Sequence, residues 1–178
     1  THLRKYLLIS SAIQIIFVVL DLSVGKITGH LEVIRTVQIF NYAVAGLCLF
    51  LTIGVFVRKK TFIYELEGSV NTDKWNDAFA TIACLSLAGL PAFNIFVSKW
   101  ALFTSAYEFS PSLTLFGIFA TLLLFIMYYK IVYVLLVGGG KKQEAPKAVT
   151  VINGALAAMV IALGVIPQIQ WWLLPMVN

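Results

Sequence analysis

The sequence has few charged residues and few of the side chains on which common enzyme sites depend. Charged residues make up 12% of the 178 residues, and the chain has two histidines and two cysteines. His2 and His30 lie in polar ends of segments, and neither a serine, histidine and aspartate arrangement nor a glycine-rich phosphate loop is present. These absences exclude the usual soluble enzyme classes, and we predict no catalytic residue.

The two cysteines do not indicate a disulfide or a metal site. Cys48 and Cys84 each lie within an apolar segment, where a free cysteine behaves as a small hydrophobic side chain. We therefore expect both thiols to be buried. The sequence predicts neither a bound metal nor another cofactor.

Apolar residues, in contrast, are abundant. They make up 60% of the chain, and the mean hydropathy is +0.92, which lies outside the usual composition of soluble domains and is typical of polytopic membrane proteins. A helix needs roughly 20 apolar residues to cross a bilayer. The sequence predicts an all-α membrane protein with about six transmembrane segments, at residues 6–22, 37–57, 76–90, 93–107, 113–137 and 148–174.

The basic residues lie mainly at the ends of the apolar runs. The net charge of +5 therefore indicates interfacial anchors in a lipid bilayer and argues against a nucleic-acid partner. If all six segments cross the membrane, the basic residues divide almost evenly between the two sides: Arg4, Lys5, Arg58, Lys59, Lys60 and Lys74 on one, and Lys26, Arg35, Lys141, Lys142 and Lys147 on the other. This pattern predicts no orientation.

One lysine lies inside an apolar run. Lys99 follows the stretch LAGLPAFNIFVS, and a lysine near the centre of a bilayer costs from about 2.5 kcal/mol to about 10 kcal/mol or more, depending on the scale. Upstream, Gly89 and Pro91 break the helical pattern, because proline lacks the N–H and clashes with the preceding turn. An interrupted helix beside a buried charge is typical of ion pathways, so we expect a helix interrupted between Pro91 and Lys99 and a functional role for Lys99.

These residues carry a family resemblance. The stretch SLAGLPAFNIFVSKW resembles the motif SLAG(I/L)PPFxGFxSKW of the antiporter-type subunits shared by respiratory complex I, Mrp-type cation/proton antiporters and energy-converting membrane-bound hydrogenases. In that family the lysine of the motif belongs to a broken helix and takes part in ion translocation, and Lys99 occupies its position. Ala92 stands where a second proline is common, which leaves the break to Gly89 and Pro91.

The first segment resembles the start of a family helix, DIKRxLAYSSISQIG, with Arg4 at the usual lysine position; the resemblance implies a part for Arg4 in ion translocation. Ser10 and Gln14 share one face of this helix. Two interpretations of these side chains stay open, namely hydrogen bonds between helices and a chain of water molecules. Asp21 closes the segment, and we expect it to be solvated near the interface.

The second segment departs from the family. Where family members carry a stripe of two histidines and a lysine suited to relaying protons, this chain has Gln38, Tyr42 and Gly46. None of these residues titrates near neutral pH. A relay that requires reversible protonation cannot be built from them, although Gln38 and Tyr42 could hold a water molecule.

Lys130 is the second candidate cation in the apolar part of the chain, and the stretch that contains it, MYYKIVYV, is similar to a family motif YYLRV. Its side chain could extend to the membrane surface or share a hydrated cavity with Lys99, and the two alternatives are even. The side chains one turn from Lys99, such as Ile95 and Phe103, are apolar. Its partner is therefore expected to be Lys130, water, backbone carbonyls near Leu90 or a group of another subunit.

The resemblance covers nearly the whole chain and implies a single membrane domain, residues 1–178, similar to the second of two inverted five-helix repeats plus a closing helix. It implies a half-length antiporter-like subunit, non-catalytic itself, of a multi-subunit respiratory redox complex resembling complex I or a membrane-bound hydrogenase, in the cell membrane or an energy-converting organelle membrane. There it contributes to proton or sodium translocation through a buried lysine axis. The alternative is a structural subunit that seals the membrane and transfers no ion.

Overall fold

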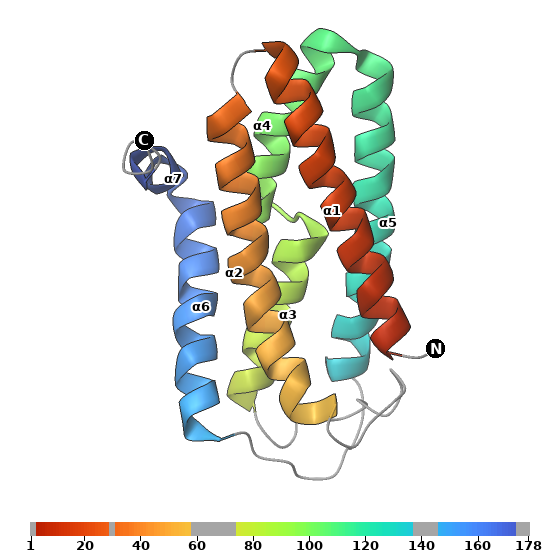
Figure 1. Cartoon of the computed structure of the whole chain (residues 1–178). Helices are drawn as coiled ribbons and strands as arrows, with labels where there is room; N and C mark the ends of the chain where they lie inside the picture. The colour runs from red at the N-terminus through yellow and green to blue at the C-terminus, as the bar shows by residue number, and fades with distance from the viewer. Residues whose placement is uncertain (1–2, 29–30, 58–73, 137–145, 174–178) are drawn as a thin grey trace.

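The computed structural model describes residues 3–28, 31–57, 74–136 and 146–173. These residues form helices and contain no strand, which confirms the predicted all-α fold (Figure 1). The helices are α1 (Leu3–Thr28), α2 (Leu31–Val57), α3 (Lys74–Ala88), α4 (Asn94–Phe109), α5 (Pro111–Leu136), α6 (Lys147–Val165) and α7 (Gln168–Leu173).

Three stretches of the described residues are long and apolar enough to cross a membrane, Lys5–Val24, Pro111–Leu136 and Lys147–Val165. A shorter apolar helix covers Val37–Ile53. Large apolar side chains such as Phe116 and Ile126 on α5 are exposed on the outside of the bundle, whereas several polar side chains are buried inside it. The many exposed apolar side chains fit a bundle surrounded by lipid or by other membrane subunits.

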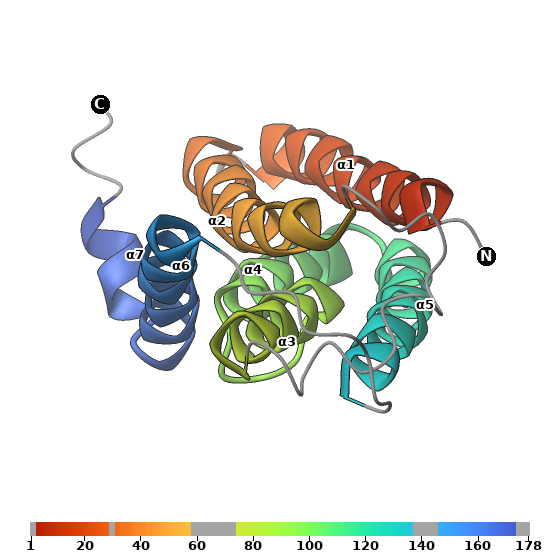
Figure 2. The same ribbon diagram turned by 90° about the horizontal axis from the view of Figure 1, so that it is seen from below.

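Helices α3 and α4 follow one another along the bundle and together run its length (Figure 1). Viewed from below, they lie one behind the other in the middle, with α1, α2, α5 and α6 around them (Figure 2). The break occupies residues 89–93, and Lys99 is the sixth residue of α4. The third and fourth predicted segments are therefore two halves of one crossing, with the interruption between the halves and not at Lys99.

The break has a defined backbone. Gly89 has φ +84°, and its N–H donates to Ser86 O at 2.8 Å. Glycine is suited to this angle because it has no Cβ. Ala92 also has a positive φ, of 74°, which proline cannot adopt since its ring holds φ near −65°. The alanine at this position thus permits a break geometry that a second proline would exclude.

Helix α6 packs directly on this break. A Cβ added to Gly164 would overlap the backbone of Ala92 and Phe93, so glycine is what allows the close approach. The final predicted segment is divided: α6 ends at Val165, Pro167 follows, and α7 begins at Gln168. Proline cannot continue the helix without losing a hydrogen bond, which explains the separate helix α7.

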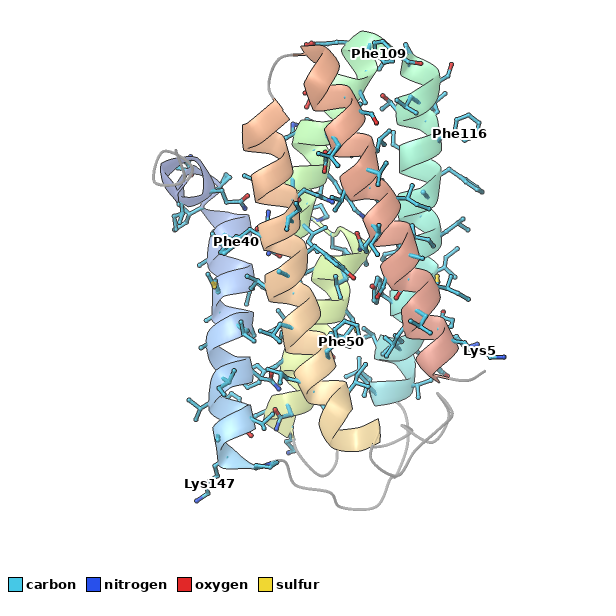
Figure 3. The ribbon with its side chains drawn as sticks, in the orientation of Figure 1. Lys5, Phe40, Phe50, Phe109, Phe116 and Lys147 are labelled. Carbon is cyan, nitrogen blue, oxygen red and sulfur yellow. The ribbon has the colours of Figure 1, made fainter. Side chains whose placement is uncertain are left out.

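Because α3 and α4 make a single crossing, the helix ends are arranged differently from the sequence-based expectation. The start of α1, the end of α2, the start of α3, the end of α5 and the start of α6 lie at one end of the bundle (Figure 1). Lys5 and Lys147, which the sequence placed on opposite sides, lie together at this end, and Phe109 lies at the other (Figure 3). We call these the basic end and the opposite end.

The helix ends at the basic end carry Arg4, Lys5, Lys74 and Lys147, and those at the opposite end carry Lys26 and Arg35. The sequences that join helix ends of the basic end, residues 58–73 and 137–145, contain five further basic residues, Arg58, Lys59, Lys60, Lys141 and Lys142. Basic residues in short loops favour the cytoplasmic side of a membrane. We therefore predict that the basic end faces the cytoplasm.

Single cysteines test this orientation. A membrane-impermeant thiol reagent should label Glu108→Cys, at the opposite end, in intact cells, and should label Lys147→Cys only after the membrane is opened. Both side chains are exposed, and the native Cys48 and Cys84 are buried, so the unsubstituted chain serves as the unlabelled control. Labelling of Lys147→Cys in intact cells would reverse the predicted orientation.

Candidate functional site

Lys99 is buried in the middle of the bundle. Its side chain is 2% exposed, and its Nζ lies 4.6 Å from the centroid of the Phe17 ring on α1. A Cβ placed on Gly89 would lie 3.4 Å from the same Nζ and 3.4 Å from Thr121 Cγ2 of α5. The amine therefore lies beside the helix break, between α1 and α5, where the aromatic face of Phe17 favours its charged form.

The Lys99 Nζ has no hydrogen-bond partner among the described residues. An amine has hydrogen-bonding capacity to satisfy, and an unpaired buried polar group costs free energy. Lys99 is thus a buried amine to which the described residues present a ring face but no anion within hydrogen-bond distance. Water is the expected partner, because the described side chains leave this group unsatisfied.

Gln14 lies on the same side of α1 as Phe17 and joins α1 to the break. Its Nε2 donates to Leu87 O at 2.9 Å, two residues before Gly89, while its Oε1 has no partner. Tyr128 of α5 lies near both Gln14 and Ser10. Gln14 therefore makes the predicted bond between helices and also keeps a free acceptor for water.

An asparagine pair fixes the start of α4. Asn94 Nδ2 donates to Asn41 O at 3.1 Å and to Asn41 Oδ1 at 3.2 Å, and Asn41 Nδ2 donates to Asn94 O at 3.0 Å. Ser86 Oγ donates to Asn94 Oδ1 at 2.6 Å, and Asn41 Nδ2 also donates to Gln170 Oε1 at 3.0 Å. The network links α2, α3, α4 and α7 across the break. Sequence analysis missed it, although an asparagine within an apolar stretch was a usable signal.

A second buried polar network lies along α2, α3 and α6. Asn153 Nδ2 donates to Thr52 Oγ1 at 2.9 Å and to Asn76 Oδ1 at 3.2 Å, and Asn76 Nδ2 donates to Thr150 Oγ1 at 2.9 Å. These are neutral groups that bond mainly to one another. We assign this network to helix packing, since hydrogen bonds between membrane helices stabilise a bundle.

The expectation that Asp21 is solvated is wrong. Its side chain is 0% exposed, and neither carboxylate oxygen has a hydrogen-bond partner. Asp21 belongs to the buried face of α1, on which residues recur at every third or fourth position, and the turn of the helix therefore directs it into the bundle. The other members of this face are Leu7, Ser10, Gln14, Phe17 and Val24.

The three residues at the family's relay positions lie on one side of α2. Gln38 is 1% exposed and its Oε1 has no partner, Gly46 is buried, and Tyr42 is half-buried and close enough to Tyr128 for an electrostatic interaction. The structure therefore gathers the candidates Gln38 and Tyr42 inside the bundle. Their role stays a prediction.

A lysine at position 46 should be poorly tolerated. A Cβ on Gly46 would lie 4.0 Å from Tyr42 Cε2, an ordinary contact, so Gly46→Ala is the matched control and should assemble normally. Gly46→Lys adds a buried cation at a cost of at least about 2.5 kcal/mol. We expect a lower melting temperature and less assembled protein in detergent extracts; a fully stable Gly46→Lys variant would show that this region is already hydrated.

The structure separates the predicted cations. Lys130 is exposed on α5, so in this chain it does not share the buried surroundings of Lys99. Arg4 lies in the first turn of α1, and its side chain is outside the described residues. Cys48 and Cys84 are buried free thiols, as expected, and no group of three metal-binding side chains occurs in the described ranges.

Comparison with known proteins gives a family match and a similar relative. Residues 1–139 match a family described as "NADH:quinone oxidoreductase/Mrp antiporter, TM". The chain is also similar to the NADH-quinone oxidoreductase subunit N of Geotalea uraniireducens, strain Rf4, with 26% identity over 176 residues. That match covers 94% of this chain and 37% of the relative. The chain thus spans little more than a third of the curated relative it matches.

Proposed function

Since the chain belongs to the transmembrane family of NADH:quinone oxidoreductase and Mrp antiporter subunits, we propose that it carries part of the path of a translocated cation, with Lys99 at its centre. The coupled ion is a proton or Na⁺. The membrane domain would act within a larger redox-driven assembly, as the name of its relative suggests, while the electron-transfer chemistry belongs to other parts of that assembly.

The buried, unpartnered Nζ of Lys99 carries this proposal. A lysine kept only for packing would be expected to reach a carbonyl, a carboxylate or the membrane surface. Lys99 does none of these among the described residues; it lies under Phe17 and beside the helix break. An unpaired amine at this depth costs stability, which supports a role that stability alone does not explain.

The break itself supports the same role. Where a helix is interrupted, N–H and C=O groups lose their intrahelical partners and need other partners at membrane depth. Gln14 satisfies part of this need, because its Nε2 donates to Leu87 O near the end of α3. The remaining free acceptor of Gln14, beside Leu87, offers a position for water next to Lys99. Water molecules here would connect the amine to the surrounding polar groups.

The mechanism is electrostatic. A cation that approaches Lys99 is repelled by the ammonium and not by the neutral amine, so loss or gain of one proton at Nζ changes the local potential. The low-dielectric surroundings strengthen this effect. The presence or absence of a proton on Lys99 would thereby change how readily a cation binds at neighbouring sites in the membrane. These sites include those of flanking subunits.

The test is reconstitution of the complete assembly into sealed vesicles, with electron transfer and ion uptake recorded on the same sample. The proposal expects the number of ions moved per electron to depend on the Lys99 charge. If the number of ions moved per electron is the same with and without that charge, the chain has a structural role only. Replacing H₂O with D₂O and varying Na⁺ in the same assay distinguishes the two candidate ions.

A further inference from the structure

Asp21 is a buried carboxyl group that the path proposed above does not use. It is 0% exposed, and both of its oxygens lack partners. Of the acidic side chains that the structure describes, Asp77 has an interaction partner and Glu108 is exposed. Asp21 is thus the acid that is both inside the bundle and unsatisfied within the described residues.

Asp21 lies one helical turn along α1 from Phe17, the residue that contacts Lys99. Phe17, which contacts Lys99 Nζ through its ring, precedes Asp21 by one helical turn on the same buried face. One turn of four residues corresponds to about 6 Å along the helix. The Phe17 ring also lies 6.2 Å from the Phe103 ring of α4 in an edge-on arrangement. Phe17 therefore joins α4 to the buried face of α1 on which Asp21 lies.

Gln38 of α2 lies at about the same height in the bundle as Asp21 of α1. Helices α1 and α2 form a hairpin with two residues between them, and Asp21 lies seven residues before the end of α1, as Gln38 lies seven residues after the start of α2. In an antiparallel pair, residues equally far from the turn lie side by side. Gln38 is 1% exposed with an unpartnered Oε1. A water molecule between these oxygens would satisfy both.

Among the described residues, Lys99 is the buried basic side chain that could exchange a proton with Asp21. On α2 the buried neighbours Gln38 and Asn41 are neutral, and on α4 the buried residues beyond Lys99 are Leu102 and Ala106. The side chains of Lys26 and Arg35 lie outside the described residues. Neither Asp21 oxygen nor Lys99 Nζ has a hydrogen-bond partner among the described residues, so a proton that passes between them needs an intervening water molecule.

We propose that Asp21 is a second proton-binding group of this chain and exchanges a proton with Lys99 through water. The exchange would take place on the side of Phe17 that is nearer to the end of α1 and the start of α2. In the forward step the Asp21 O–H bond breaks and an N–H bond forms at Nζ, which leaves a carboxylate and an ammonium; the reverse step restores the neutral pair. The proton needs no other reactant. Asp21 lies closer than Phe17 to the opposite end of the bundle, so it would connect Lys99 to that end. This inference rests on the proposed function.

Asp21→Asn tests the inference in the complete assembly in sealed vesicles. The amide keeps the size of the side chain but cannot exchange a proton in this way, so we expect proton translocation to fall at least about a hundredfold, the lower end of the range for a lost acid–base group. Asp21→Glu restores a carboxyl group and should retain most of the activity. Ser23→Ala is the matched control, because Ser23 is exposed on the same helix and its hydroxyl bonds only to Val19 O.

An infrared difference spectrum recorded during turnover detects a change in the protonation of a carboxyl group. A carboxyl group with a purely structural role would show no such change. The carboxyl band of Asp21 should change on turnover, shift in Asp21→Glu and disappear in Asp21→Asn. If Asp21→Asn does not assemble, the band shift in Asp21→Glu decides. Wild-type translocation in Asp21→Asn, or no Asp21 band, overturns the inference. If Asp21→Asn translocates protons like wild type but Lys99→Met does not, only this inference fails. If both variants translocate like wild type, the proposed function fails as well.

Discussion

Lys99→Met should abolish most ion translocation while electron transfer and assembly continue. Methionine has nearly the same length as lysine and fills the space beside Gly89 and Phe17, so it leaves no large cavity. It removes a buried cation that has no hydrogen-bond partner, which relieves a desolvation cost. We therefore expect unchanged or slightly higher stability and a fall in ions moved per electron of at least about tenfold, measured in sealed vesicles.

Lys130→Met is the matched control for this prediction. It makes the same chemical change at an exposed position on α5, and a lysine that extends to the membrane surface contributes little to a buried path. Its ion-to-electron ratio should stay close to wild type. If Lys130→Met has the larger effect, the exposed surface of α5 and not the bundle interior carries the ion. If Lys99→Met fails to assemble, Lys99 is a partner in an ion pair with another subunit.

The largest loss of stability is expected for Asn94→Ala. This side chain accepts from Ser86 and donates to Asn41 at the start of α4, and it is 0% exposed. Its removal leaves several buried groups unsatisfied, each at a cost of about 1–3 kcal/mol. We expect a marked fall in the melting temperature of the detergent-extracted protein, together with loss of the fixed position of Lys99.

Ser98→Ala provides the comparison for Asn94→Ala. Ser98 is buried on the same helix, but its hydroxyl bonds to Ile95 O within its own turn, so its loss should have a small effect. Equal melting temperatures for the two variants would mean that the network through Asn41 does not hold the break together. Protection of backbone amides near Leu90 from hydrogen exchange should decrease in Asn94→Ala and stay unchanged in Ser98→Ala.

Sequence patterns predicted the class of this protein well because they depend on local properties. Long apolar runs can be satisfied in a bilayer only by helices, since every backbone group must find a partner within its own segment. The positions of α1, α2 and α5 followed from this rule. Gly89 and Pro91 predicted the break for an equally local reason, which is the backbone conformation that each residue allows or excludes.

The orientation of the charges depended on information that is not local. Whether residues 74–109 form two crossings or one cannot be inferred from their hydropathy, because each half is too short by itself and α3 and α4 become one crossing only by lying end to end. This arrangement moves Lys147 to the same end as Lys5 (Figure 3). An apparently even charge distribution then becomes a strongly uneven one.

For the candidate site, the sequence by itself determined that a lysine lies next to a broken membrane helix, because the residue types and their spacing require no tertiary contact. Only the tertiary structure decided what surrounds that lysine. Asp21 seemed solvated from its place near the end of an apolar run, yet the rotation of α1 directs it into the bundle with Gln14 and Phe17. Burial depends on which helices pack against which face, and that is settled by the whole bundle.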